Sequence, residues 1–202
     1  MQFYNDIITQ NSFVYLQNLK KKYKFILIGG WAVFLYSKSL KSKDIDIIID
    51  YDVLAEFKEM EEVFKNERLS KYEINTGNFD IDIYIPYYSK LGIDIEEIKK
   101  SAIQKEGFFV PILEILFLMK LFAWHNRRGS SKGQKDELDI FSLAFLPEFD
   151  WKKYLKFVNR LNFSEFHKEF VKLLKNTTSV KELDINEQKM SKIKKRILSE
   201  MG

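Results

Sequence analysis

The chain is 202 residues long and carries 33 Lys and Arg against 29 Asp and Glu, a formal charge of +4. Hydrophobic residues make up 46% of it, which is enough apolar surface for a packed core and excludes a disordered chain. The absence of cysteine excludes a disulfide scaffold, a thiolate metal site and a thiol nucleophile, and two histidines argue against a His-rich zinc site. The sequence has neither a run of about 18 apolar residues, as a membrane span would need, nor the pattern of a secretory signal. We therefore expect a cytoplasmic protein without a membrane partner.

Charge is distributed unevenly along the chain. Residues 151–202 carry a net charge of +7, whereas residues 1–150 carry −3. A basic tail behind an acidic front indicates an anionic partner such as a nucleic acid, although a solvated helical face has the same composition.

The first half of the sequence alternates between helical and strand patterns. Apolar residues recur every three to four positions in the helical segments, whereas polar and apolar residues alternate in the strands. The expected elements are a helix over 6–22, a strand over 25–28, a helix that begins right after Gly29 and Gly30, a strand over 44–50, a helix over 52–69 with Asp52 as its N-cap, and a strand over 78–86.

The second half is dominated by helical patterns. Residues 95–105 favour a helix whose end is uncertain, and 107–111 favour a short strand. Helices are then expected over 112–128, 135–146, 151–161, 164–174 and 186–198, with residues 129–134 as a loop. The sequence thus predicts an α/β (α+β) fold: a core over 1–111 with a small mixed sheet flanked by helices, and a helical region over 112–202 that closes over the cleft.

Two pairs of aspartates stand two positions apart on the expected strands, Asp44 with Asp46 and Asp80 with Asp82. Side chains at i and i+2 leave the same face of a strand, roughly 6–7 Å apart. Carboxylates this close repel each other unless a cation neutralises them, and oxygen ligands favour Mg²⁺. We therefore expect a metal site that activates an attacking oxygen and stabilises a leaving pyrophosphate. Taken alone, an Asp-x-Asp strand is more typical of a solvated acidic edge.

Gly29 and Gly30 lie between a strand and the N-terminus of a helix. Glycine lets the backbone approach a phosphate, which the free N–H groups and the helix dipole attract. The pair lacks the G-x-G-x-x-G spacing, which argues against a dinucleotide-binding Rossmann unit.

A diglycine, a gap of thirteen residues and an Asp-x-Asp strand together resemble the signature of the polymerase-beta-like nucleotidyltransferase superfamily. The segment GGWAVFLYSKSLKSKDIDIII is similar to the start of AbiEii-type and related minimal nucleotidyltransferases, and of small aminoglycoside and lincosamide nucleotidyltransferases. The later segment LMKLFAWHNRRGSSKGQKDELDI resembles the AbiEii-type pattern of a helix lysine, an arginine-containing spacer and a K/R-D-x-x-D pair. The resemblance covers residues 25–146.

The resemblance implies roles for individual residues of this chain. Trp31 departs from the Ser or Thr that many relatives place after the glycine pair, which weakens the phosphate contact there. In the first motif, Gly29 and Gly30 would bind the triphosphate, and Ser42 stands at the position of a nucleotide-binding Ser or Thr. Asp44 and Asp46 would bind the metal, and Asp82 (or Asp80) would be a third carboxylate that binds metal and activates the acceptor hydroxyl. In the later motif, Lys120 would contact a phosphate, and Asp136, flanked by Lys135 and Asp139, would hold Lys120 or the substrate.

Some of these residues also have structural interpretations. A lysine in an apolar helix, as Lys120 is, usually extends to the surface. Acids such as Asp136 and Asp139 are favoured in the first turn of a helix, and cations such as Arg127 and Arg128 are common at a helix end.

The resemblance implies a nucleotidyltransferase dependent on Mg²⁺, with Mn²⁺ as the alternative ion. It would move a nucleoside monophosphate from an NTP such as ATP to an acceptor hydroxyl and release pyrophosphate. The AbiEii-type pattern further implies the toxin of a toxin–antitoxin pair, with tRNA or a protein hydroxyl as acceptor and a cognate antitoxin as partner. Two alternatives stay open: a drug-modifying nucleotidyltransferase, against which the basic C-terminal half argues, and a catalytically inactive binding protein of the same fold.

Overall fold

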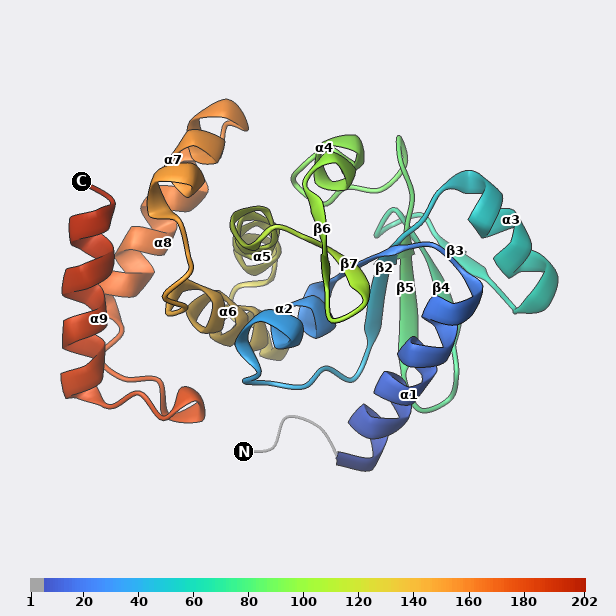
Figure 1. The fold of residues 1–202 in the computed structure, drawn as a ribbon, viewed down its shortest axis with the longest axis horizontal. Helices are drawn as coiled ribbons and strands as arrows, with labels where there is room; N and C mark the ends of the chain where they lie inside the picture. Colours follow the sequence, from blue (N-terminus) through green and yellow to red (C-terminus); the bar gives the residue numbers. More distant parts are fainter. Residues whose placement is uncertain (1–5) are drawn as a thin grey trace. The chain divides into compact units, whose positions relative to one another are not determined.

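The chain forms two compact units, Met1–Ile112 (the N-terminal unit) and Leu113–Gly202 (the C-terminal unit). The structure is a computed structural model that describes residues 6–202. Strands and helices alternate in the N-terminal unit, whereas the C-terminal unit is helical (Figure 1). Within the described residues, no helix is long and apolar enough to cross a membrane.

A mixed β-sheet forms the centre of the N-terminal unit. Within residues 6–112 its seven strands are arranged in the order β3-β4-β5-β2-β1-β7-β6. The pairs β2–β5 and β1–β7 are parallel, and the other neighbours are antiparallel. The expected α/β fold with a small mixed sheet and a helical second half is therefore confirmed. The strands are β1 (Ile26–Ile28), β2 (Ile45–Ile48), β3 (Phe64–Asn66), β4 (Lys71–Asn75), β5 (Asp80–Tyr84), β6 (Ala102–Lys105) and β7 (Phe108–Pro111).

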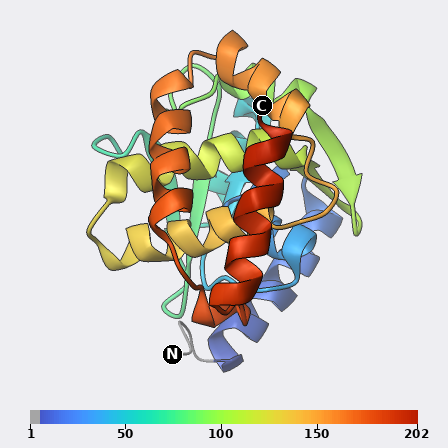
Figure 2. The same cartoon turned by 90° about the vertical axis from the view of Figure 1, so that its left-hand side faces the viewer.

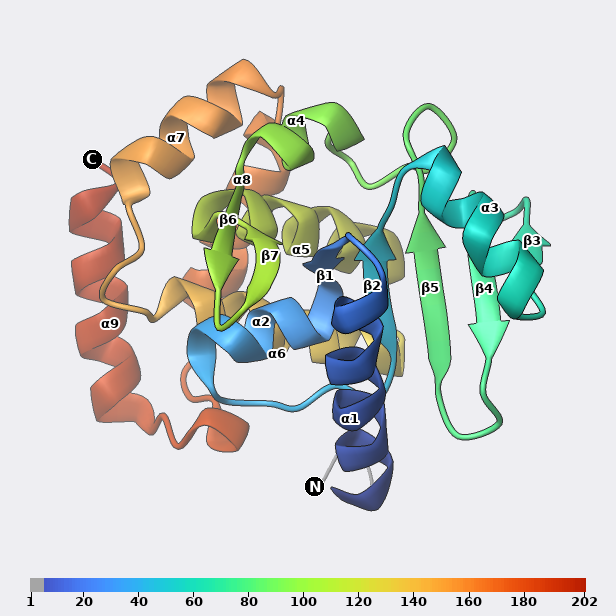
Figure 3. The same cartoon turned by 45° about the vertical axis from the view of Figure 1, so that its right-hand side comes forward.

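The two faces of strands β2, β5 and β4 differ sharply in polarity because side chains alternate along each strand. Figure 3 shows these strands side by side, with helices α1 (Asp6–Lys22) and α3 (Tyr51–Met60) passing in front of the sheet. Buried isoleucines and Tyr72 share one face, and the ammonium of Lys58 on α3 lies 4.9 Å from the Tyr72 ring centroid. Helix α3 therefore packs on this apolar face, and the acidic residues of the three strands point to the other face.

Trp31 anchors helix α2 (Gly29–Ser37) to helix α1. It is 1% exposed, its indole N–H donates to the Ser12 hydroxyl at 3.0 Å, and its ring lies 4.9 Å from that of Phe13. The residue that follows the diglycine is thus part of the core, where burial of a large ring and one satisfied hydrogen bond fix the direction of α2.

An aromatic cluster forms the core of the C-terminal unit, whose helices Figure 2 shows in colours running from yellow-green to red. Phe117 is fully buried, and its ring lies 5.0–6.0 Å from the rings of Phe149, Trp151, Tyr154 and Phe170. These residues join four segments of the unit around one side chain. The helices are α5 (Leu113–Arg127), α6 (Ser131–Ala144), α7 (Trp151–Arg160), α8 (Ser164–Asn176) and α9 (Glu187–Glu200), with a 3₁₀ turn at Lys181–Leu183.

The helix expected over 52–69 is partly wrong. Helix α3 ends at Met60, and β3 and β4 follow it. Because β3 pairs with β4 and β4 pairs with β5, tertiary pairing overrides the local helical pattern of residues 61–69. Asp52 is not the N-cap either, since α3 begins at Tyr51 and Asp50 holds the cap position.

Two further boundaries differ from those expected. Helix α4 (Ile95–Lys100) ends before β6, which pairs with the expected strand β7. Helix α6 begins at Ser131, within the segment expected to be a loop, because the Ser130 hydroxyl caps the helix by accepting from the Gly133 N–H at 3.0 Å.

Candidate active site

Three carboxylates stand in a row across strands β2, β5 and β4. Asp82 is the register partner of Asp46 in the parallel pair and of Glu73 in the antiparallel pair. Register partners point to the same face of the sheet and lie close together. We call Asp46, Asp82 and Glu73 the acidic row. The sequence predicts two of its members, and the strand that carries the third was not expected.

Asp44 and Asp80 lie one row away on the same face. Asp44 precedes β2, and its Oδ1 accepts a hydrogen bond of 3.1 Å from the Asp80 backbone N–H. Asp82, not Asp80, is therefore the direct neighbour of Asp46.

Gly29 places the start of helix α2 directly against the acidic row. Its φ is +64°, and a Cβ at this position would overlap the Asp46 carboxylate. The N-cap residue, Ile28, gives no side-chain hydrogen bond to the helix. The first N–H groups of α2 therefore begin beside a carboxylate, and the N-cap side chain itself does not bond to them, which is an arrangement suited to a phosphate joined to a metal ion.

Lys71 supplies the positive charge next to the acidic row. This lysine on β4 is 8% exposed, and its Nζ lies 2.6 Å from Asp82 Oδ2 and 2.8 Å from Glu73 Oε1. Burial lowers the pKa of Lys71, but the two carboxylates outweigh burial and the pKa is raised. Lys71 thus stays charged and is shared by two members of the row.

Asp82 is a strongly perturbed carboxylate. Burial first, and then the negative charge of Asp46, raise its pKa to about 7, against the opposing effect of Lys71. The ammonium of Lys71 therefore does not fully compensate the negative charge of the three neighbouring carboxylates.

A divalent cation is the obvious remaining source of positive charge. Carboxylate oxygens are suitable ligands for Mg²⁺ or Mn²⁺, and the uncompensated charge of the row fits such an ion. Within residues 6–202, however, no group of three or more His, Cys, Asp or Glu side chains is arranged to hold a metal. The site expected at Asp44, Asp46 and Asp82 is thus not pre-assembled, because Lys71 engages Asp82 and the Asp80 N–H engages Asp44. Metal binding stays a prediction.

The later motif forms a separate ion-pair network on α5 and α6. Lys120 Nζ lies 2.7 Å from Asp139 Oδ2 and 3.3 Å from Asp136 Oδ1, and Arg127 lies 2.6 Å from Asp136 Oδ2. Lys120 is 7% exposed and Asp139 is fully buried. The expectation that Asp136 holds Lys120 agrees with this geometry. The helix-start interpretation of the two aspartates is wrong, since both lie inside α6.

Gly133 allows α5 and α6 to meet closely at this network. A Cβ here would overlap the carbonyl oxygen of Arg127. Of the other predicted residues, Ser42 is 3% exposed, next to the turn that leads into β2. Arg128 pairs with Glu169, as His125 does, so these two side chains tie α5 to α8.

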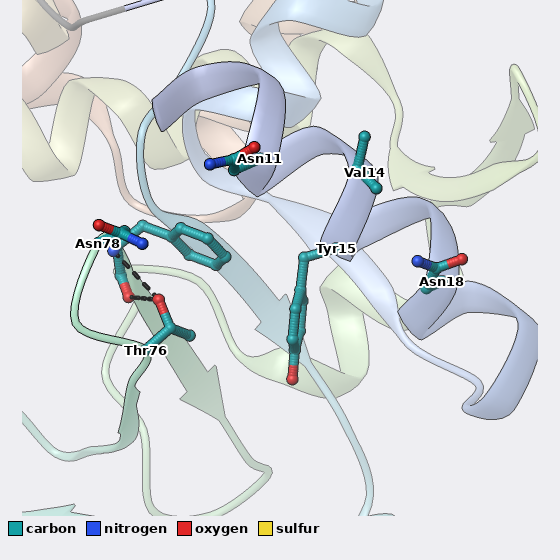
Figure 4. Close-up of a pocket in the computed structure, with 7 residues that line it drawn as sticks. Asn11, Val14, Tyr15, Asn18, Thr76 and Asn78 are labelled. Atoms are coloured by element: carbon teal, nitrogen blue, oxygen red, sulfur yellow. Dashed lines mark hydrogen bonds between the residues drawn. The ribbon is translucent and has the colours of Figure 1, made fainter. Parts of the chain in front are cut away.

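A shallow pocket of about 290 Å³ lies elsewhere in the N-terminal unit. Figure 4 shows it between α1, which contributes Tyr15 and two asparagines, and the turn from β4 to β5, which contributes Thr76 and Asn78. None of the predicted site residues lines it.

Comparison with known proteins identifies the fold. No family model matches the chain, and no curated protein matches it. Among solved structures, the chain is similar to a candidate nucleotidyltransferase from H. pylori, with a TM-score of 0.55 and 16% identity over 98% of this chain and 97% of that one. It is also similar to ANT(2")-Ia, solved in complex with adenylyl-2"-tobramycin, with a TM-score of 0.52 and 13% identity over 82% of this chain and 99% of that one. The chain has a nucleotidyltransferase fold.

Replacing Gly29 tests the close approach of helix α2 to Asp46 within this nucleotidyltransferase fold. Gly29→Ala introduces a strained positive φ and a steric overlap with a carboxylate, whereas Gly77→Ala, at φ +83° in open space, introduces only the strain. We expect Gly77→Ala to lower the free energy of unfolding by about 1–2 kcal/mol and Gly29→Ala by at least about 1 kcal/mol more. Urea denaturation measures both, and equal losses would contradict the overlap.

The raised pKa of Asp82 predicts how stability depends on pH in the metal-free protein. The folded chain binds a proton at Asp82 that the unfolded chain has released between the ordinary carboxylate pKa of 3.8 and about 7. Stability is therefore highest below pH 4 with respect to this group and falls as the pH rises to about 7. Asp82→Asn removes this dependence, by up to about 4 kcal/mol between pH 4 and pH 8.

Urea denaturation in EDTA at several pH values measures this dependence. Asp52→Asn, an exposed residue outside the acidic row, should follow the wild-type profile. If Asp82→Asn also follows the wild-type profile, the pKa of Asp82 is not raised in the folded protein.

Proposed function

We propose that the chain is a nucleotidyltransferase that moves a nucleoside monophosphate from an NTP to an acceptor hydroxyl. The observation that carries the proposal is the contact of the Gly29 turn with Asp46, which brings the N-terminus of α2 beside two same-face carboxylates on β2 and β5. The nucleotidyltransferase fold supports it.

The Gly29 turn and three aspartates would have different roles in the transfer. Backbone N–H groups at Gly29 and Gly30 would bind the triphosphate. Asp44, Asp46 and Asp82 would hold Mg²⁺ or Mn²⁺, which supplies charge neutralisation for the phosphates when bound. The acceptor oxygen would attack the α-phosphorus, the bond to the β-phosphate would break, and pyrophosphate would leave. Asp82 would take the proton of the acceptor hydroxyl.

The acceptor class follows from charge. Residues 151–202 carry a net charge of +7, which favours a nucleic acid such as tRNA over a cationic drug, with a protein hydroxyl as the remaining macromolecular acceptor. The AbiEii-type resemblance adds that the activity is toxic and is restrained by a cognate antitoxin. The fold similarity to ANT(2")-Ia favours a second candidate, transfer to a small hydroxylated acceptor.

A transfer assay tests the function directly. The protein is incubated with each α-labelled NTP, Mg²⁺, and either tRNA, total protein or an aminoglycoside. We expect label on tRNA, a loss of at least about 100-fold in Asp44→Ala plus Asp46→Ala, and no loss in the control Asp52→Ala. Label on the aminoglycoside would support the second candidate. A folded protein that labels none of the acceptors would contradict catalysis and favour a binding protein of the same fold.

Lys120→Met separates the implied phosphate contact from a purely structural role. A nucleotide contact predicts a rise in the KM for NTP of at least about tenfold with folding retained. A brace between α5 and α6 predicts a loss of about 3–5 kcal/mol in unfolding free energy, since Asp139 would be left buried without its cation. Steady-state kinetics and urea denaturation on the same variant distinguish the two.

A further inference from the structure

We propose that Lys71 is a built-in counter-ion that a divalent cation must displace from Asp82, so that metal capture at this carboxylate depends on bound nucleotide. This inference rests on the proposed function, because it concerns the metal that the function requires. It makes Lys71 a positioning residue, which acts through Asp82.

The contacts of Lys71 support the first half of the proposal. Its Nζ lies 2.6 Å from Asp82 Oδ2, the side chains of the two residues are 10% and 16% exposed, and both lie on neighbouring strands of one sheet. An ammonium and a divalent ion that compete for the same carboxylate repel each other at this range, and the repulsion is strong where water is scarce. A metal ion therefore cannot bind fully at Asp82 while Lys71 remains on it.

Glu73 supplies the alternative position for the displaced ammonium. Glu73 Oε1 already lies 2.8 Å from Lys71 Nζ, and its side chain is 32% exposed, twice the fraction of Asp82. Lys71 can thus leave Asp82 and still keep its ion pair with Glu73, whereas a lysine with one partner would be left buried and uncompensated. The pair Asp82 and Glu73, on adjacent strands in register, gives the lysine two binding positions.

Nucleotide changes the balance between the two cations. Without nucleotide, a metal ion that binds Asp82 has to take the place of Lys71 there. A triphosphate adds negative charge beside Gly29, which follows the end of β1 where Ile28 pairs with Asp46. That charge favours the divalent ion over the ammonium. The ion would interact with phosphate and carboxylate together, whereas the ammonium of Lys71 is held on β4 by carboxylates.

Mn²⁺ binding to the full chain tests the proposal without any turnover. The free-ion signal in electron paramagnetic resonance gives the Mn²⁺ Kd with and without a nonhydrolysable NTP, once the Mn²⁺ that the NTP binds in a protein-free titration has been subtracted. We expect Lys71→Met to bind Mn²⁺ about tenfold or more tightly than wild type without nucleotide, and the two proteins to converge within about threefold with it. Lys71→Arg should behave as wild type, and so should Lys58→Met, which removes a lysine of the same unit that lies over the Tyr72 ring on the opposite face.

Asp82→Asn shows whether the effect passes through Asp82. In the double variant Lys71→Met with Asp82→Asn, the gain in Mn²⁺ affinity should disappear relative to Asp82→Asn alone. A gain that persists in that background would be a general charge effect and would overturn the proposal, as would an unchanged Kd in Lys71→Met.

If Lys71→Met does not fold, a substitution of the half-buried Glu73 tests the same proposal. Glu73→Gln should weaken Mn²⁺ binding without nucleotide by about threefold or more, because Lys71 then has only Asp82, and Asp82→Asn should abolish this loss as well. Wild type that binds Mn²⁺ with nucleotide while these variants show no change would overturn the role of Lys71 alone. Wild type that binds no Mn²⁺ with nucleotide would overturn the proposed function and this inference together.

Discussion

Repulsion among the three carboxylates of the acidic row is the constraint on which the N-terminal unit depends. Like charges on directly opposed strand positions destabilise a sheet, and here the charge of Asp46 and burial together raise the pKa of Asp82 to about 7. Two features make the row tolerable: the buried ammonium of Lys71 and the absence of a side chain at Gly29, which leaves room for Asp46. The repulsion on the acidic face does not contribute to packing, because β5 packs through Ile81 and Ile83 on its other face, and both are fully buried.

The part of the site that the sequence predicts is local. Gly29 and Gly30 end one strand, and the alternation of acids with isoleucines places Asp44 with Asp46, and Asp80 with Asp82, on one face whatever the rest of the chain does. The pairing of Asp46 with Asp82 is not local, since register depends on which strands become neighbours. The mixed sheet could therefore be predicted, whereas the choice between Asp80 and Asp82 needed the structure.

Lys71 and Glu73 were missed because their strand lies between the helix expected over 52–69 and the strand expected over 78–86, where no element was expected. β4 has only five residues, three of them polar, and it follows a strongly helical segment. The alternation of Lys71, Glu73 and Asn75 with Tyr72 and Ile74 is the signal that would have found it. A short strand with one polar face is stabilised mainly by its neighbour β5, and that contribution is invisible in a single sequence window.

The two lysine–carboxylate clusters differ in the charge balance of the side chains that they bring together. On α5 and α6, Lys120 and Arg127 face Asp136 and Asp139, so two cations compensate two carboxylates in a buried network. Beside Gly29, Lys71 contacts two of the three carboxylates of the acidic row. The charges of the network on α5 and α6 balance and its ion pairs join two helices, although within the described residues the buried Asp139 Oδ1 has no hydrogen-bond partner. A network with excess negative charge next to the N-terminus of a helix has a place for a cation and for the anion that accompanies it. The physical difference between the clusters therefore lies in the charge that is left over, since both contain a buried lysine held by two acids.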